Sequence, residues 1–434
     1  MNNDGRKFCV PDRVKNILII FLSVSALFLS TRTGMYSQLF HSSPFISSAL
    51  RYLSEFFTAD YSVSAEDAKG YSQAAKPFAV LTRSAGDEMY VSMWNSDDLE
   101  SAYDSYSAAL GEALGSAGEA SEITEQSYRS LLENNSCVYF DFYYPQQLSL
   151  LAGWLGTSMS DSHTTSAVLL AESPDSGSVL CYMDYSSGVF YRCLTELSWS
   201  SVSSKLAEHN DVSAKLAYML GYSNQGLDPY TIIPDKTPQK NSFATKNPFR
   251  INLLTSSVLS VFSMNSYIAS VYQESDGTTV YVESDRTLRI SPDGCVIFRS
   301  AETSSQAISV STADCLELAY QLVSSCAGLC SSDLDIYLIA ADRQSGECTF
   351  TFGYVLDGIP LVADDGSFAA QVRVNSAGIN WASILFRSYE DTGESVVLLP
   401  ASLQAAVIQT TGGGKMFLTY SDNGLTAEPQ WSAY

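Results

Sequence analysis

Residue types that carry out chemistry are sparse in this sequence. It contains three histidines, His41, His163 and His209, and none lies near another His or Cys at the spacing of metal ligands. A zinc site or a Ser-His-Asp triad is therefore poorly supported. Three hydroxyl residues follow His163 directly, which favours a polar turn at that point.

Two short strings resemble parts of catalytic or nucleotide-binding motifs. Ser421-Asp422-Asn423 matches one motif of the penicillin-binding transpeptidases, but their Ser-x-x-Lys and Lys-Thr-Gly motifs are absent. Asp and Asn before Gly424 are typical of a hairpin turn, which we predict instead. The run Gly412-Gly413-Gly414-Lys415 lacks the first Gly and the final Ser or Thr of a phosphate loop. A strand is expected after it, so we interpret the run as a flexible connector.

Carboxylates are the remaining residue type that could form a functional site. The pairs Asp97-Asp98 and Asp364-Asp365 have the charge to bind Ca²⁺, but no Asp-x-Asp-x-Asp-Gly loop supports such a site. Glycosidase carboxylates stay open, because their separation exists only in three dimensions. The tryptophans are scattered, which favours core packing over a sugar-binding groove. The sequence predicts no catalytic residue, no cofactor and no metal site.

The cysteines form no Cys-x-x-Cys pair, so a zinc ribbon or thioredoxin-type site is not expected. Cys315 and Cys326 share one helical face with apolar residues, and most of the nine cysteines are expected to be buried as small apolar side chains. Cys330 and Cys348 are the best candidates for a disulfide, although the sequence leaves the pairing open.

The strongly negative net charge argues against two classes of partner. The 434-residue chain has a formal net charge of −23. No basic surface is available to neutralise phosphates, which argues against nucleic acid. The same charge argues against the bulk of the chain lying on an anionic membrane surface. No small-molecule substrate is expected.

One N-terminal segment is apolar enough to cross a membrane. Residues 16–31 carry no charge and are bracketed by Lys15 and Arg32. The stretch is slightly shorter than the about 20 residues that a bilayer core needs, and the flanking cations extend it by snorkelling. Basic residues before it predict a cytoplasmic N-terminus. A cleaved signal peptide is the alternative, but no A-x-A-like site follows the apolar run.

Small and weakly polar residues form a stripe along this membrane helix. Asn16, Ser23 and Ser30 are spaced by seven residues, and Ala26 lies close to the same face. Such a stripe is how membrane helices pack against and hydrogen-bond to a partner. We therefore predict a partner-binding face at Asn16, Ser23, Ala26 and Ser30.

The sequence predicts an ordered series of segments along the chain. They are a cytoplasmic tail (1–15), a transmembrane helix (16–34), a stalk (35–75), a first extracellular α+β domain (76–230), a linker (231–250) and a second extracellular α+β domain (251–434). The linker is expected because periodicity is lost over residues 228–250, where four prolines stand among Lys, Asn and Ser.

The first domain is expected to combine helices with strands in no regular βαβ order. Ser96 is the expected N-cap of a helix that buries Leu99, Tyr103, Tyr106 and Leu110, with Asp97 in its first turn. A second helix is predicted at 123–132. Strands are predicted at 78–82, 89–94, 137–142, 167–171, 179–185 and 189–194.

The second domain carries repeated hairpin signals, such as Asp276-Gly277, Asp293-Gly294 and Asp357-Gly358. We expect antiparallel sheet with one or two helices on a face. Helices are predicted at 312–325 and 402–409. Strands are predicted at 280–283, 287–290, 296–299, 335–340, 349–356, 369–375, 379–389 and 416–420.

Three features together resemble a known family. They are the N-terminal anchor, the meander-helix-strand order of the second domain, and a set of short stretches, which are 352–361, 372–374 with Ile379, 418–420 and 428–431. The combination is similar to the YycH/YycI family of Gram-positive bacteria, and it covers the anchor and much of residues 260–434. The resemblance implies a PepSY-like second domain and no catalytic residues. It also implies a single-pass accessory whose partners are a sensor histidine kinase that controls cell-wall metabolism and a second single-pass accessory protein.

Three functions are therefore weighed. The first is a non-enzymatic regulator of a sensor kinase in the cell membrane. The second is a cell-wall hydrolase, which requires a deep pocket with convergent carboxylates or a Ser-Lys pair. The third is a module that binds wall polymer or peptide, which predicts an exposed sheet edge or an aromatic groove.

Overall fold

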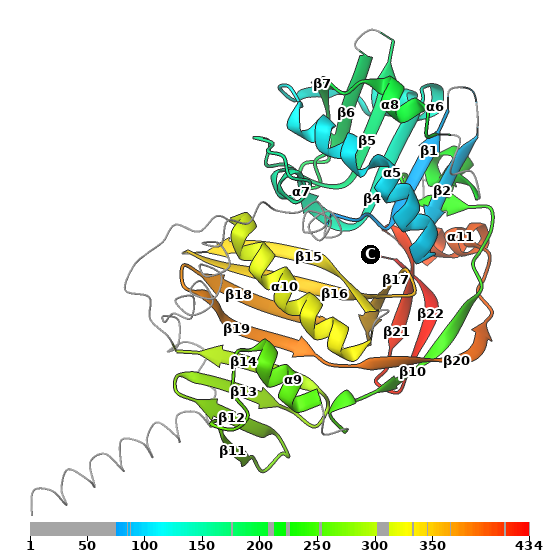
Figure 1. Ribbon diagram of the computed structural model, residues 1–434. Helices are drawn as coiled ribbons and strands as arrows, with labels where there is room; N and C mark the ends of the chain where they lie inside the picture. Colours follow the sequence, from blue (N-terminus) through cyan, green and yellow to red (C-terminus); the bar gives the residue numbers. More distant parts are fainter. Residues whose placement is uncertain are drawn as a thin grey trace, which may run out of the picture.

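The computed structural model describes residues 75–433, apart from gaps at 85, 87, 175–176, 207–211, 223–225, 251–253, 302–311, 332–333, 345, 365 and 412–413. The predicted cytoplasmic tail, transmembrane helix and all but the last residue of the stalk lie outside the described residues. Within the described part, the chain forms two antiparallel-rich sheets with few helices (Figure 1). The α+β class is therefore confirmed.

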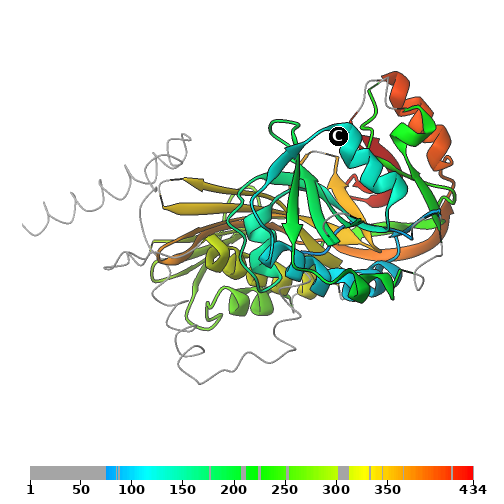
Figure 2. The same cartoon turned by 90° about the horizontal axis from the view of Figure 1, so that it is seen from above.

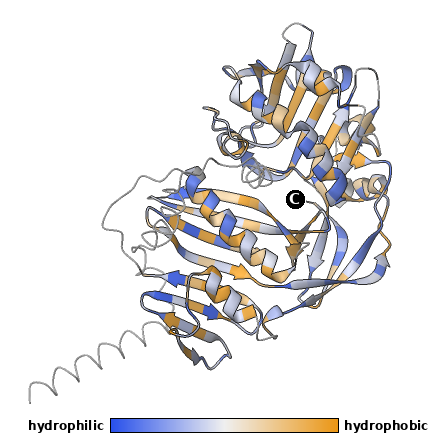
Figure 3. Ribbon diagram, viewed as in Figure 1, coloured by the Kyte–Doolittle hydropathy of each residue, from blue (hydrophilic) through white to orange (hydrophobic). Residues whose placement is uncertain are grey.

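The first sheet is antiparallel throughout and is built from nine strands in the order β3-β7-β6-β5-β4-β1-β2-β8-β9. Its long central strands are apolar along both faces, as the colouring of Figure 3 shows. The strands are β1 (Ala79–Arg83), β2 (Met89–Met93), β3 (Ser121–Ile123), β4 (Cys137–Gln147), β5 (Thr164–Ser173), β6 (Gly177–Met183), β7 (Phe190–Thr195), β8 (Ser213–Leu216) and β9 (Ile232–Pro234).

Both faces of this sheet are covered, which explains why its strands lack polar alternation. Val138, Phe140 and Leu170 pack toward α5, whereas their neighbours Tyr139 and Leu169 belong to a separate cluster with α6. The helices are α5 (Ser96–Gly115), α6 (Glu125–Asn134), α7 (Leu148–Trp154), α8 (Trp199–Ser203) and the 3-10 turn η1 (Ala217–Leu220).

Helix α5 buries the predicted face, but its cap lies one residue earlier than predicted. The side chain of Asn95, not Ser96, accepts a hydrogen bond from the backbone N–H of Asp97, at 3.1 Å. Asn95 has the extended backbone of a cap residue, and Ser96 is already helical. This shift brings Ser96 into the first turn, where it lines the cleft described below.

The second sheet has thirteen strands, and among the described strands only β17 and β21 pair in parallel. Its order is β11-β12-β13-β14-β19-β18-β16-β17-β21-β22-β10-β20, with β15 paired to β16. The strands are β10 (Lys240–Lys246), β11 (Ser270–Gln273), β12 (Thr279–Glu283), β13 (Arg286–Ile290), β14 (Cys295–Ser300), β15 (Leu334–Gln344), β16 (Glu347–Leu356), β17 (Ile359–Ala363), β18 (Ala370–Asn375), β19 (Gly378–Leu385), β20 (Ser388–Val396), β21 (Met416–Asp422) and β22 (Thr426–Ala433).

Helices of both sheets share one side of the molecule. In Figure 2, α5, α9 and α10 line one side of the view, and α11 lies on the other. The helices of the second part of the chain are α9 (Leu254–Val261), α10 (Thr312–Cys330), α11 (Ala401–Thr411) and the 3-10 turn η3 (Pro248–Arg250). Helix α10 packs on β15, β16, β18 and β19, which are four neighbouring strands of the second sheet.

The predicted linker at 231–250 contains regular structure. It holds β9, which completes the first sheet, and β10, which lies between β22 and β20 of the second sheet. Pro234 is the last residue of the edge strand β9, and Pro248 opens η3, so these prolines lie at the ends of elements and do not prevent strand formation. The chain crosses between the sheets at 235–239.

The two sheets share one hydrophobic core. A single cluster of buried residues includes Leu99 and Phe140 of the first part and Phe298 and Tyr354 of the second. A smaller cluster joins η1 and β9 to α11, with Ala217, Ile233, Ala405 and Ile408 among its members. The described parts of the two sheets therefore pack as one body.

Cys330 and Cys348, the predicted disulfide candidates, are free thiols in this structure, as are the other described cysteines. Cys348 lies beside Cys315 near the start of α10, where burial and then the Cys348 thiol raise the pKa of Cys315 to about 12. Cys330 lies at the other end of the helix, about 22 Å along its axis at 1.5 Å per residue. The expected burial of most cysteines is confirmed.

Candidate functional site

The two sheets meet at a cluster of aromatic rings. Phe78 lies 5.1 Å from Tyr337 between ring centroids, and Tyr143 lies 5.7 Å from the same ring. Tyr337 is the cross-strand partner of Gly353, and a Cβ added there would lie 2.3 Å from the tyrosine ring. Gly353 therefore leaves the space in which Tyr337 lies at the junction of the sheets.

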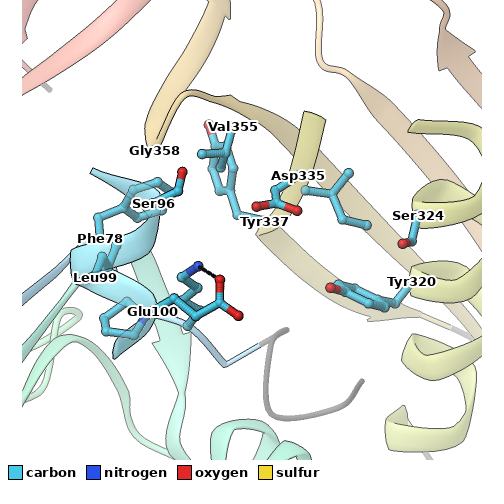
Figure 4. A pocket seen from close by; sticks show the side chains of 13 residues that line it. Phe78, Ser96, Leu99, Glu100, Tyr320, Ser324, Asp335, Tyr337, Val355 and Gly358 are labelled. Carbon is cyan, nitrogen blue, oxygen red and sulfur yellow. Dashed lines mark ion pairs between the residues drawn. The ribbon is translucent and has the colours of Figure 1, made fainter. Parts of the chain in front are cut away.

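A cleft opens beside this junction, between α5 and residues 76–78 on one side and α10, β15 and β16 on the other (Figure 4). Its cavity has a volume of about 410 Å³, which falls in the usual range of ligand sites. Apolar and aromatic side chains form much of the wall, and hydroxyls and charged groups project from it. The residues that line it include Lys76, Leu99, Glu100, Tyr320, Asp335 and Tyr337.

A turn from the second sheet closes one end of the cleft. Gly358, between β16 and β17, has a φ of +74°, and a Cβ there would lie 3.0 Å from the backbone nitrogen of Ser96. Only glycine fits both this conformation and this distance. The Asp357-Gly358 turn, predicted as a hairpin signal, therefore also brings the second sheet against the start of α5.

Carboxylates dominate the charge inside the cleft. Glu100 is paired with Lys76 at 3.8 Å, whereas no hydrogen bond or ion pair joins Asp335 to any residue that the structure describes. Figure 4 places the Asp335 carboxylate between α5 and α10, on the same side as Tyr320 and Ser324. Burial, and then the negative charge of Asp335, raise the pKa of Tyr320 to about 12, so its hydroxyl stays protonated.

A second cavity of about 560 Å³ adjoins the first, because both are lined by Ser96 and Asp335. Two further carboxylates line this second cavity, but both have partners. Asp357 accepts from Lys240 at 2.8 Å, and Asp391 accepts from Asn241 at 3.0 Å. Asp335 is thus the unpaired carboxylate at the point where the cavities meet.

A buried ion pair lies between the sheets at Lys415, in the run predicted to be a flexible connector. Its ammonium contacts the carboxylate of Asp141 on β4, and the two side chains are 9% and 6% exposed. Gly412 and Gly413 lie outside the described residues, but Gly414 pairs with the Gly226–Asp228 segment of the first part of the chain. The connector prediction is therefore wrong for Lys415, which fastens one sheet to the other.

The other sequence candidates have structural roles. Asp422 is buried and accepts from Tyr389 at 2.9 Å and Thr245 at 3.2 Å. Asn423 and Gly424, with a φ of +87°, form the turn between β21 and β22, as predicted. Nothing in this geometry positions Ser421 as a nucleophile.

His163 belongs to a small polar network that the sequence analysis missed. Its Nδ1 lies 2.6 Å from one carboxylate oxygen of Asp161. The other oxygen of this carboxylate accepts a hydrogen bond from the hydroxyl of Tyr182. The imidazole stacks on Tyr191 at 4.6 Å between centroids. Tyr182 comes from β6, so only strand pairing brings the group together, and sequence spacing carried no signal for it.

One edge of the second sheet, as far as the structure describes it, is apolar. β11 is the last strand of the sheet, and none of the residues from Tyr267 to Gln273 is charged. Tyr267 is 95% exposed, and Ile268, Val271 and Tyr272 are each more than half exposed. An exposed edge with apolar side chains is a template for pairing with another strand. We call Tyr267, Ile268, Val271 and Tyr272 the edge surface.

The predicted partner-binding face of Asn16, Ser23, Ala26 and Ser30 lies outside the described residues. Among the residues that are described, no helix is long and apolar enough to cross a membrane. Comparisons with protein-family models, with curated proteins and with solved structures found no match for this chain.

Proposed function

We propose that this chain is a non-enzymatic, membrane-anchored regulator of a two-component sensor histidine kinase that controls cell-wall metabolism. In this proposal residues 16–34 cross the membrane once, the N-terminus is cytoplasmic, and the two sheets lie outside the cell. The second sheet would then be the PepSY-like part. The chain acts by contacts: the anchor packs beside the kinase's membrane helices, and the outer part engages the kinase sensor or a second single-pass accessory.

The observation that supports this proposal most strongly is the edge surface on β11. An extended segment of the partner adds to β11 through main-chain hydrogen bonds, and its apolar side chains cover Val271 and Tyr272. Binding of this kind shifts the equilibrium between the two signalling states of the kinase only if these states differ in their affinity for the edge surface. The absence of charge at the edge matters, because a chain of net charge −23 repels an acidic partner elsewhere.

A pull-down from the native membrane in mild detergent tests the proposal. Full-length tagged protein is compared with an anchorless form, with the triple change Asn16→Leu, Ser23→Leu and Ser30→Leu, and with the pair Val271→Lys and Tyr272→Lys. We expect the full-length protein to retain a histidine kinase or a single-pass accessory, and both sets of substitutions to weaken this retention.

Leu425→Lys is the matched control, because Leu425 is also an exposed apolar residue, in the turn between β21 and β22. It should leave retention unchanged. If no membrane partner comes down with any form, the regulator proposal fails. The outer part would then be screened against wall fragments, since Glu100 and Asp335 line one cavity, as the carboxylates of a wall hydrolase would.

A further inference from the structure

The cleft between the sheets has the chemistry of a binding site for an organic cation. Its cavity of about 410 Å³ has room for an extended chain of several carbon atoms. Leu99 and the rings of Tyr320 and Tyr337 supply apolar wall, and Asp335 supplies a negative charge that no described residue neutralises. We propose that the cleft binds an alkylammonium group carried on an apolar stem, with the ammonium against Asp335.

The unneutralised charge at this position favours a cation. Glu100 lies on the opposite wall and is only loosely held by Lys76, at 3.8 Å. The hydroxyl of Tyr320 is neutral, and Asp391 and Asp357 lie in the adjoining cavity with their own partners. Lys76 is the cation among the lining residues, and it is already paired with Glu100. An anion would meet repulsion at Asp335, and a neutral ligand would leave that carboxylate unpaired.

The walls add selectivity for the stem. Aromatic faces attract cations as well as methylene groups, and two tyrosines flank the path to Asp335. The walls come from both sheets, so a ligand that fills the cleft contacts α5 and α10 together. The site therefore exists only when the sheets are packed as described.

The test uses full-length protein in detergent with 1,5-diaminopentane as the probe, followed by calorimetry. Pentan-1-ol and glutarate are the neutral and anionic controls of similar length. We expect the amine to bind, its affinity to fall with added salt, and the controls not to compete. Asp335→Asn should weaken amine binding by about tenfold or more, which corresponds to one lost charge contact.

Asp342→Asn is the matched control, because Asp342 is an exposed carboxylate on the same strand, β15, outside the lining of both cavities. It should leave the affinity unchanged. Both variants are expected to fold, since each changes an exposed side chain, and far-ultraviolet circular dichroism checks this. Equal binding by wild type and Asp335→Asn, no binding of the amine, or equal binding of pentan-1-ol would overturn the proposal.

A free amine and a lysine side chain of a polypeptide share this chemistry. Acetyl-Ala-Lys-Ala-amide, compared with its norleucine counterpart, separates them: tighter binding of the lysine peptide than of the diamine points to a polypeptide ligand, and the reverse points to a free amine. The inference does not rest on the kinase proposal. Loss of the partner in the pull-down leaves amine binding untouched, and loss of amine binding leaves the edge surface untouched.

Discussion

A lysine after three glycines reads as an exposed loop residue, yet Lys415 is buried against Asp141. Sequence reasoning had no access to this contact, because 274 positions separate the two residues. Nothing in the sequence indicated that Glu100 and Asp335 line one cavity, since Glu100 lies on α5 and Asp335 on β15, far apart along the chain. By contrast, the turn at Asn423-Gly424 was predictable, because a glycine with positive φ is a local requirement.

The Asp141–Lys415 pair gives the first prediction at this scale. Burial raises the pKa of Asp141 to about 6, and the Lys415 ammonium opposes that rise. In Lys415→Met the opposing charge is lost, so the pKa of Asp141 rises further above its unfolded value. We expect a loss of about 3 kcal/mol in the free energy of unfolding at neutral pH.

The sign of the pH dependence follows from the same shift. A carboxyl whose folded pKa is raised binds a proton more tightly when folded, so stability is gained as pH falls through that pKa and lost as pH rises through it. The deficit of Lys415→Met should therefore shrink from pH 7.5 to pH 5.5, as measured by urea unfolding of the full chain. Adding Asp141→Asn should remove this pH dependence. A deficit that is constant across this range would contradict the assignment.

Elements with strong periodicity were predicted and elements with short or polar sequences were not. α5 and α10 were expected because their apolar residues recur at helical spacing, and both begin within a residue of the expected start. β10, with the sequence Lys-Asn-Ser-Phe-Ala-Thr-Lys, carries no such signal, because its neighbours β20 and β22 stabilise it by pairing. β17 was missed although the Asp357-Gly358 hairpin signal precedes it, and its sequence, Ile-Pro-Leu-Val-Ala, is short and contains a proline. Tertiary pairing, not local propensity, decides such strands.

The Asp357-Gly358 turn gives a prediction at the scale of elements. Gly358→Ala adds a Cβ in contact with the start of α5, and Gly346→Ala adds one at the turn between β15 and β16, where nothing lies within 4 Å. Both glycines have positive φ, so both variants lose about 1 kcal/mol from backbone strain. We expect Gly358→Ala to lose about 1 kcal/mol more, because a neighbour must move. Equal losses in thermal or chemical unfolding would show that the turn does not press on α5.

The whole molecule behaves as one cooperative unit if its core is continuous. One cluster of buried side chains includes residues of both sheets. The contact between the rings of Tyr143 and Tyr337 and the Asp141–Lys415 ion pair also bridge the sheets. The predicted boundary between domains at 231–250 marks a crossing of the chain and does not divide the core. Separate domains were expected because length and prolines suggested them, and neither reports packing.

Hydrogen exchange tests this cooperativity. Leu169→Ala removes a fully buried side chain from the first sheet, remote from the second, and should cost about 2–5 kcal/mol. We expect the most protected amides of β18 and β19 to exchange faster in this variant by the same factor as those of β5 and β6. Val282→Ala changes a half-buried residue on β12 of the second sheet and is the milder, converse test: it should accelerate exchange in both sheets to a smaller extent. Acceleration confined to the first sheet would show two independent units.

The position of β10 also has a consequence for how the chain reaches this structure. Asn241 on β10 and Asp391 on β20 are 150 positions apart, and Thr245 and Asp422 are 177 apart. At synthesis rates of about 5–20 residues per second, β10 waits roughly 8–30 s for its first neighbour. Both of its edges are open during that interval, and the late closure of such long loops makes completion of the sheet slow. Nascent chains that have passed β10 but not β22 are therefore the species most exposed to aggregation, and the best clients for a holding chaperone.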